Sequence, residues 1–276
     1  MHSLIFGTAG IPTSTEERST LNGIKQIKKL SLGAMEMEFV QSVNISEEKA
    51  PEVKKTAQEN DVILTCHGQY FINLNAVEKA KIEASKQRIF KAAKIADLCG
   101  AFSMTFHPAF YLGQEKSLVY DKVKIQLKEV VKQIQNAGHK IWVRPETTGK
   151  GAQFGDIDEL LKLSTEIEQV MPCIDFAHLH ARSGGKYNTT PEFREVLEKV
   201  EKMLGKEGLQ NMHIHMSGIA YSEKGEKNHL ILEESDFKYK DLLKVWKEFK
   251  IKGVVINESP NIEEDALLMK RTFELI

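Results

Sequence analysis

Short apolar segments alternate with longer amphipathic segments along almost the whole chain. The apolar segments are rich in Val, Ile, Phe and Met and are bounded by Gly, Pro, Asn or Asp, which is typical of buried parallel strands. This pattern predicts eight strands, at residues 4–6, 34–40, 62–66, 103–106, 140–143, 171–176, 211–215 and 253–256.

The longer segments carry apolar residues at helical spacing, with Lys and Glu on the opposite face. They predict helices at residues 20–30, 76–98, 119–135, 158–169, 191–204, 239–249 and 262–275. Thr190 followed by Pro191 is typical of an N-cap with proline at the first helical position.

Strands that alternate with helices predict a parallel sheet with right-handed crossovers. Eight repeats can close into a barrel, and an open doubly wound sheet is the alternative. No linker, low-complexity tract or change of composition divides residues 1–276. We therefore expect one α/β domain, a (β/α)8 TIM barrel.

Composition excludes several classes of protein. Apolar residues make up 41% and charged residues 28%, which are globular values. No apolar run approaches the roughly 20 residues needed to span a bilayer, and the start of the chain lacks the pattern of a secretory signal. Three widely spaced cysteines (Cys66, Cys99 and Cys173) favour reduced thiols in the cytoplasm. We expect a cytoplasmic protein, and nothing in the sequence requires more than a monomer.

Histidines occupy the places where strands are predicted to end. Six of the nine lie at or just after such ends, and a seventh lies in the loop after the seventh strand: His67, His107, His178, His180, His213, His215 and His229. Three acids have equivalent places: Glu146, Asp175 and Glu258. In a barrel of this kind the carboxyl ends of the strands meet at one mouth, where the active site lies. His139 precedes the fifth strand and is expected at the opposite end.

So many imidazoles and carboxylates cannot be buried together as free groups without large costs of desolvation and repulsion. Divalent metal ions remove this cost, because they neutralise the acids and accept the imidazole lone pairs. Mixed His and carboxylate ligation favours zinc, with manganese or iron as the alternatives.

The segments around these residues resemble motifs of the endonuclease IV family, zinc-dependent apurinic/apyrimidinic endonucleases with a xylose-isomerase-like barrel. The matching segments, in chain order, are His67-Gly-Gln-Tyr-Phe-Ile-Asn-Leu74, Phe106-His107-Pro108, Pro145-Glu146-Thr-Thr-Gly-Lys-Gly151, Cys173-Ile-Asp175-Phe-Ala-His178, His213 to Ser217, and Glu258-Ser-Pro260. On these motifs the chain is identified as a divergent, archaeal-type member of the family.

The resemblance implies a cluster of two or three zinc ions and a site for duplex DNA that contains abasic sites. The implied ligands are His67, His107 and Glu146 for the first ion; Glu146, Asp175, His213 and Glu258 for the second; and His178 with His229 for the third. It also implies hydrolysis of the phosphodiester 5′ to the abasic site, with Glu146 or Glu258 orienting the attacking water. Tyr70 and Phe71 are expected to stack on bases, and Lys150, Arg182 and Lys227 are candidate phosphate contacts.

Two segments and two histidines depart from the family, and the charge of the chain also counts against a DNA substrate. Lys227 stands where the family has an aspartate ligand of the third ion, and Glu226 is the nearest acid that could substitute. The arginine loop after the second strand is replaced by a segment that begins at Glu36. The formal net charge of −1 gives no overall attraction to nucleic acid. His180 and His215 have no counterpart in the motifs.

Two other functions remain open from sequence. A sugar isomerase or epimerase of the same superfamily would use Glu146, Asp175, His213 and Glu258 for one metal ion, and Glu36 or Glu38 would act on the substrate. This alternative leaves most of the other histidines unexplained. A binding protein without catalysis is the second alternative, and it would not need so many groups suited to metal.

Overall fold

Eight parallel strands form the wall of a nearly closed barrel in the computed structural model, which describes residues 3–276. The strands are β1 (Leu4–Ala9), β2 (Ala34–Glu38), β3 (Ile63–His67), β4 (Ser103–Phe106), β6 (Trp142–Pro145), β8 (Cys173–Asp175), β9 (Met212–Met216) and β12 (Gly253–Asn257). Their order around the sheet is β6-β4-β3-β2-β1-β12-β9-β8. The two terminal strands meet through the bridges Val143–Val170 and Glu146–Cys173, so the sheet curls into a barrel as predicted.

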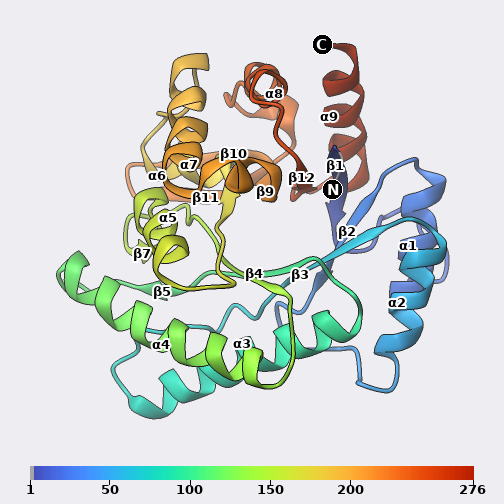
Figure 1. Ribbon diagram of the computed structural model, residues 1–276. Helices are drawn as coiled ribbons and strands as arrows, with labels where there is room; N and C mark the ends of the chain where they lie inside the picture. The colour runs from blue at the N-terminus through green and yellow to red at the C-terminus, as the bar shows by residue number, and fades with distance from the viewer. Residues whose placement is uncertain (1–2) are drawn as a thin grey trace.

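Helices surround the strands on the outside (Figure 1). They are α1 (Thr20–Lys29), α2 (Ala50–Glu59), α3 (Lys79–Leu98), α4 (Lys116–Asn136), α5 (Ile157–Glu166), α6 (Phe176–Arg182), α7 (Thr190–Gln210), α8 (Tyr239–Glu248), α9 (Glu263–Leu275) and a 3-10 turn at Leu232–Glu234. The seven predicted helices are present. Two helices were not predicted: α2, whose apolar stripe is short, and α6, which is a short run directly after β8.

Two small antiparallel hairpins lie outside the barrel wall. One pairs β5 (Ala109–Phe110) with β7 (Gln153–Phe154), and the other pairs β10 (Gly218–Ser222) with β11 (Gly225–Leu230). Both belong to loops that follow the carboxyl ends of barrel strands. They were not predicted, and the second one carries part of the site described below.

The apolar core fills the layer between strands and helices. Ile24 and Ile27 of α1, Leu127 of α4 and Trp246 of α8 are fully buried there. The described helices include none with the length and apolar character required to cross a membrane. His139 stands away from the other histidines and its Nδ1 lies 2.8 Å from Asp97 Oδ2. His2 falls outside the described residues.

Candidate metal centre

The barrel brings the predicted histidines and acids together at one mouth. His67 is the last residue of β3, His107 follows β4, Glu146 follows β6, Asp175 ends β8 and Glu258 follows β12. Four groups of side chains meet here, and within each group the ligand atoms all lie within 4.8 Å of one another. These groups are His67, His107 and Glu146; Glu146, Asp175, His215 and Glu258; His178, Glu226 and His229; and Cys173, His213 and His215.

Glu146 lies at the centre of this arrangement and belongs to two of the groups. Its Oε2 is 3.3 Å from Nε2 of His67, and its Oε1 is 3.5 Å from Nε2 of His107. Oε1 also lies 3.3 Å from Nδ1 of His178 and 3.3 Å from Nδ1 of His215. Both oxygens are buried without a hydrogen-bond partner among the described residues. A buried carboxylate of this kind is costly unless a cation binds it, so Glu146 fits a bridging metal ligand.

Three imidazoles are oriented by backbone carbonyls. Nδ1 of His67 lies 2.7 Å from the carbonyl of Gly68, Nδ1 of His178 lies 3.0 Å from that of Thr147, and Nδ1 of His229 lies 3.2 Å from that of Glu258. A ring that donates its Nδ1 hydrogen to a carbonyl keeps the lone pair on Nε2, which is how metal-binding histidines are commonly held. All three Nε2 atoms therefore suit metal ligation.

The second group differs from the sequence-based expectation in one residue. It contains His215, whereas His213 was expected. Nδ1 of His215 lies 3.3 Å from Oε1 of Glu258, and Oδ2 of Asp175 is buried without a partner. His213 lies two residues earlier on β9, and its Nδ1 lies 2.9 Å from Oγ of Ser103 inside the barrel. The residue that completes the group with Glu146 is therefore His215.

The third group depends on the β10–β11 hairpin. Oε2 of Glu226 lies 3.6 Å from Nε2 of His178, and its backbone N–H donates to the carbonyl of Gly149. Gly225, with φ at 93°, makes this close approach possible, because a Cβ there would lie 2.3 Å from the Gly149 carbonyl oxygen. Lys227, next along the strand, is exposed. Glu226 thus occupies the place that an aspartate two residues before His229 was expected to fill.

Burial and charge shift several pKa values at the candidate metal centre. Burial raises the pKa of Glu146, but the surrounding imidazoles outweigh it and hold that pKa well below the usual range. Burial lowers the pKa of His67, but Glu146 outweighs this effect and raises it to about 10. Burial also lowers the pKa of His178, but Asp175 and then Glu146 outweigh this effect and raise that pKa to about 10. Burial raises the pKa of Glu258 to about 8. Protons therefore occupy several ligand atoms at neutral pH.

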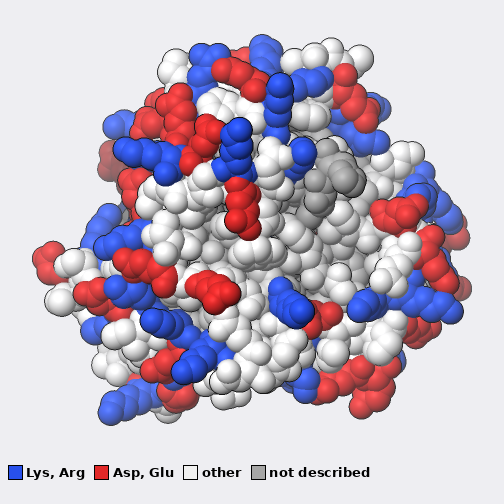
Figure 2. Space-filling view, in the orientation of Figure 1, with Lys and Arg blue, Asp and Glu red and all other residues white. Residues whose placement is uncertain are grey.

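The residues expected to contact DNA differ in their exposure and in their hydrogen bonds. Tyr70 and Phe71 are 55% and 59% exposed, which is high for aromatic side chains next to a buried site. Lys150 and Lys227 are exposed as well. Arg182 is not a free cation, because its NH1 donates to the carbonyls of Thr148, Lys150 and Gln153 and to the Thr148 hydroxyl. These hydrogen bonds stabilise the loop that follows Glu146. Figure 2 shows basic and acidic side chains intermixed over one face of the molecule.

His180, which has no counterpart in the family's motifs, has a structural role. His180 is fully buried, with Nδ1 2.8 Å from the carbonyl of Lys186 and Nε2 3.1 Å from Oδ1 of Asp236. The hydroxyl of Tyr221 donates to the same carboxylate. These contacts join α6 to the β10–β11 hairpin and hold the third group in position.

Sequence and structure comparisons place the chain among known barrels. A family model described as xylose isomerase-like TIM barrel matches residues 24–275. An uncharacterized protein of Methanocaldococcus jannaschii is 45% identical over 270 residues, which cover 98% of this chain and 97% of that protein. A probable endonuclease 4 of Oceanobacillus iheyensis is 24% identical over 184 residues, which cover 64% of this chain and 58% of that protein.

Two solved structures share the fold over nearly their whole length. A D-tagatose 3-epimerase-like protein superposes with a TM-score of 0.74 at 18% identity, covering 98% of this chain and 96% of that one. Endonuclease IV from Thermus thermophilus superposes with a TM-score of 0.72 at 18% identity, covering 98% of both chains. These two likenesses establish the fold alone, and the family model, which spans most of the sequence, shows that the chain belongs to the xylose isomerase-like TIM barrel family.

Proposed function

We propose that this protein is a metal-dependent phosphodiester hydrolase that cuts DNA 5′ to abasic sites. The observation that carries the proposal is that three groups of potential metal ligands adjoin one another. Glu146 links the group of His67 and His107 to the group of Asp175, His215 and Glu258. A further group, His178, Glu226 and His229, adjoins them. Such a chain of sites suits two or three ions that share one phosphate.

The donor set favours zinc, because neutral imidazole nitrogens and carboxylate oxygens are its usual ligands. Zinc ions bound there would supply a water of lowered pKa and would neutralise charge on the phosphate oxygens. The chain itself contributes orientation. Glu146 and Glu258 would hold the attacking water by their carboxylates, and the buried walls would exclude other water.

The rim supports a nucleic-acid substrate. Tyr70 and Phe71 lie directly after His67 and are exposed, so they can stack on bases beside a sugar turned out of the duplex. Lys150 and Lys227 are exposed in the loops after Glu146 and in the β10–β11 hairpin, where their ammonium groups can meet phosphates. The likeness in sequence to a probable endonuclease 4 supports the same substrate.

A duplex with one tetrahydrofuran abasic analogue tests the proposal directly. The analogue resists β-elimination, so a cut on its 5′ side that leaves a 3′-hydroxyl must be hydrolysis. We expect that product from zinc-loaded protein and its loss after chelation. An intact duplex, with zinc content verified on the same sample, would contradict the proposal.

A single-metal sugar epimerase is the second candidate, and one observation favours it. The quartet of Glu146, Asp175, His215 and Glu258 is sufficient for one ion. Burial raises the pKa of Glu38 to about 7, which suits a group that exchanges protons with a substrate. A D-tagatose 3-epimerase-like protein shares the fold.

The variant H229A separates the two candidates, because His229 belongs to the third group and not to the quartet. A hydrolase that uses all three groups loses most of its incision activity in H229A, whereas an epimerase that uses the quartet keeps its turnover of ketohexoses. E258Q is the control that should inactivate either enzyme.

A further inference from the structure

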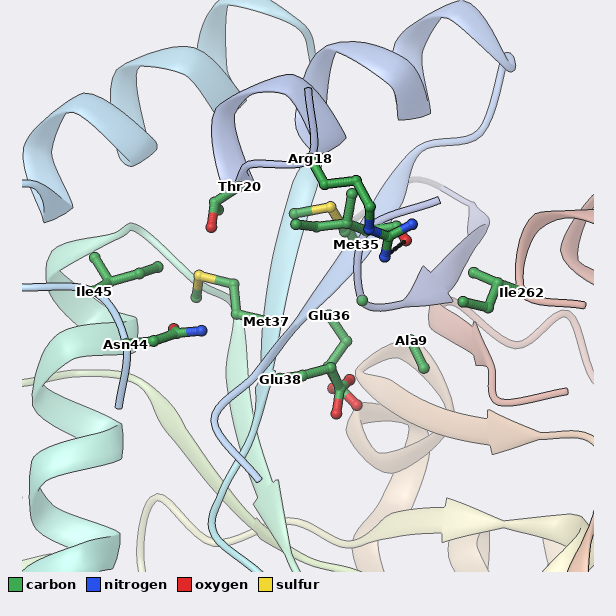
Figure 3. A pocket seen from close by; sticks show the side chains of 12 residues that line it. Ala9, Arg18, Thr20, Met35, Glu36, Met37, Glu38, Asn44, Ile45 and Ile262 are labelled. Carbon is green, nitrogen blue, oxygen red and sulfur yellow. Dashed lines mark hydrogen bonds between the residues drawn. The ribbon is translucent and has the colours of Figure 1, made fainter. Parts of the chain in front are cut away.

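Strand β2 carries a buried carboxylate, that of Glu36, next to the candidate metal centre. Glu36 is fully buried, and its apolar strand neighbours Met35 and Met37 are buried as well, so a charged group lies inside an otherwise apolar stretch of the strand. Figure 3 shows the Glu36 and Glu38 carboxylates close together, turned away from Met37 and from Thr20 on the helix side. Glu36 belongs to none of the groups with clustered ligand atoms, so its charge needs another explanation.

Two imidazoles face this carboxylate. Oε1 of Glu36 lies 2.9 Å from Nε2 of His215, and Oε2 lies 3.1 Å from Nε2 of His213. Each of the three side chains is fully buried. On the far side, Nδ1 of His213 lies 2.9 Å from Oγ of Ser103. Ser103, His213, Glu36 and His215 therefore form one continuous polar chain across the barrel interior.

His215 is the member of this chain that reaches the metal centre. Its Nδ1 faces Glu146 and Glu258, at 3.3 Å from each, while its Nε2 faces Glu36. An imidazole can offer a lone pair at Nδ1 only if the hydrogen is on Nε2, and a carboxylate next to Nε2 fixes the hydrogen there. His67, His178 and His229 have backbone carbonyls in the equivalent place.

We propose that Glu36 is a positioning residue that holds His215 with Nδ1 toward the metal, and that His213 and Ser103 support the second oxygen of Glu36. The inference rests on the proposed metal centre and applies to it whether the reaction is hydrolysis or epimerisation. It also explains the histidine pair on β9. One imidazole of the pair faces the ion, and the other, which burial keeps neutral, faces the second oxygen of the carboxylate that orients the first.

The test is zinc affinity, measured by competition with a chromophoric chelator, in E36Q and E36M. Loss of a group that orients a ligand typically weakens metal binding about 10- to 100-fold. E36M removes both acceptors and should lie near the upper end of this range. E36Q should lie near the lower end, because an amide oxygen can still accept from His215 while His213 moves its hydrogen to the nitrogen facing Ser103.

M37L is the matched control, since Met37 is the next residue of the same strand, is buried and belongs to no ligand group. It should bind zinc with the affinity of the wild type, because Met37 offers no acceptor to His215. Circular dichroism establishes that each variant is folded, and E36Q decides the matter if E36M is not.

The outcomes separate the two proposals. A graded loss in E36Q and E36M, with little change in M37L, supports the positioning role. Wild-type affinity in both Glu36 variants overturns that role and leaves the metal centre intact. Absence of zinc binding by the wild type overturns the metal centre and the inference with it.

Discussion

His178 and His229 are 51 residues apart in the chain, yet their Nε2 atoms lie 3.4 Å apart at the barrel mouth. Each ring directs its Nδ1 to a backbone carbonyl, so in their neutral forms both rings direct a lone pair on Nε2 toward the same point. Two lone pairs repel one another unless a proton or a metal ion lies between them. With the carboxylate of Glu226 alongside, the three side chains form a group that could hold a metal ion.

The first prediction concerns that third site. E226Q should lower the zinc content by up to one ion per chain, because a neutral amide is a poorer zinc ligand than a carboxylate. K227A should retain the wild-type content, because Lys227 is exposed and belongs to no ligand group. Elemental analysis after dialysis against a zinc buffer measures both. Wild-type zinc content in E226Q, or an equal loss in the two variants, would contradict the assignment of Glu226 as the acid of this site.

The two histidines of β9 give the second prediction. H215Q should abolish binding at the group of Glu146, Asp175 and Glu258, since it removes a ligand from a buried site. H213Q should keep that ion and weaken its affinity only modestly, because His213 acts through Glu36. Calorimetric titration with zinc of metal-free protein compares the pair. A stronger effect in H213Q would restore the assignment expected from the motif.

The pH dependence of metal uptake is the third prediction. In the metal-free protein the pKa values of His67 and His178 are raised to about 10 and that of Glu258 to about 8, so these atoms hold protons at neutral pH. Zinc must displace them, and affinity therefore rises with pH until the sites are deprotonated. We expect tighter binding at pH 9 than at pH 6 and release of protons into a weakly buffered solution. An affinity independent of pH over that interval would contradict these protonation states.

The sequence predicted the barrel and most of the site because both depend on the position of residues along strands. His67 and Asp175 were expected at strand ends, and β3 and β8 end on them. His213 and His215 were harder to distinguish, since alternate residues of a strand point to the same side and both enter the barrel. They differ only in depth, by roughly 6–7 Å for two residues, and the pattern of apolar positions does not define the strand end that closely.

The histidines of the third site were predicted, but its acidic member was left open for another reason. Glu226 reaches His178 only because β10 and β11 pair with a register shift at Ala220 and Tyr221, and because Gly225 packs against Gly149. Neither contact leaves a periodic pattern in the sequence. The role of Glu36 did leave a signal, since an acid between two methionines in a predicted strand indicates a charge facing inward, where it needs a partner.

The loop after β1 supplies the fourth prediction. Glu263, at the start of α9, is buried and accepts hydrogen bonds from the backbone N–H of Thr13 at 2.8 Å, from that of Ser14 at 2.7 Å and from the Thr13 hydroxyl at 2.8 Å. E263Q should destabilise the fold by about 1–3 kcal/mol, the usual cost of a lost bond to a buried charged acceptor. Urea unfolding of metal-free protein at neutral pH measures this difference.

The pKa of Glu263 determines how its contribution to the free energy of unfolding changes with pH. Burial opposes ionisation of Glu263, but the N–H donors of Ser14 and Thr13 outweigh it and lower its pKa in the folded state. Its contribution is therefore fully present above the ordinary pKa of about 4.3 and is lost as the pH falls through the lower folded value. The difference between wild type and E263Q should shrink at acid pH, and a constant difference would argue against the charged form.

The aromatic rim gives the fifth prediction. Phe71 is 59% exposed and lies four residues after His67, a member of the first candidate metal group, and stacking of a base on an aromatic ring contributes about 1–3 kcal/mol. F71A should therefore weaken binding of the abasic duplex about 5- to 150-fold at constant salt, with the zinc content unchanged. V77A is the control, since Val77 is 81% exposed in the loop before α3 and has no ring to stack. Fluorescence anisotropy at zinc saturation, in a buffer that prevents cleavage, compares them. If F71A binds as tightly as V77A, the exposed aromatic side chain has no part in gripping the duplex, and the lysines of the neighbouring loops must carry that contact.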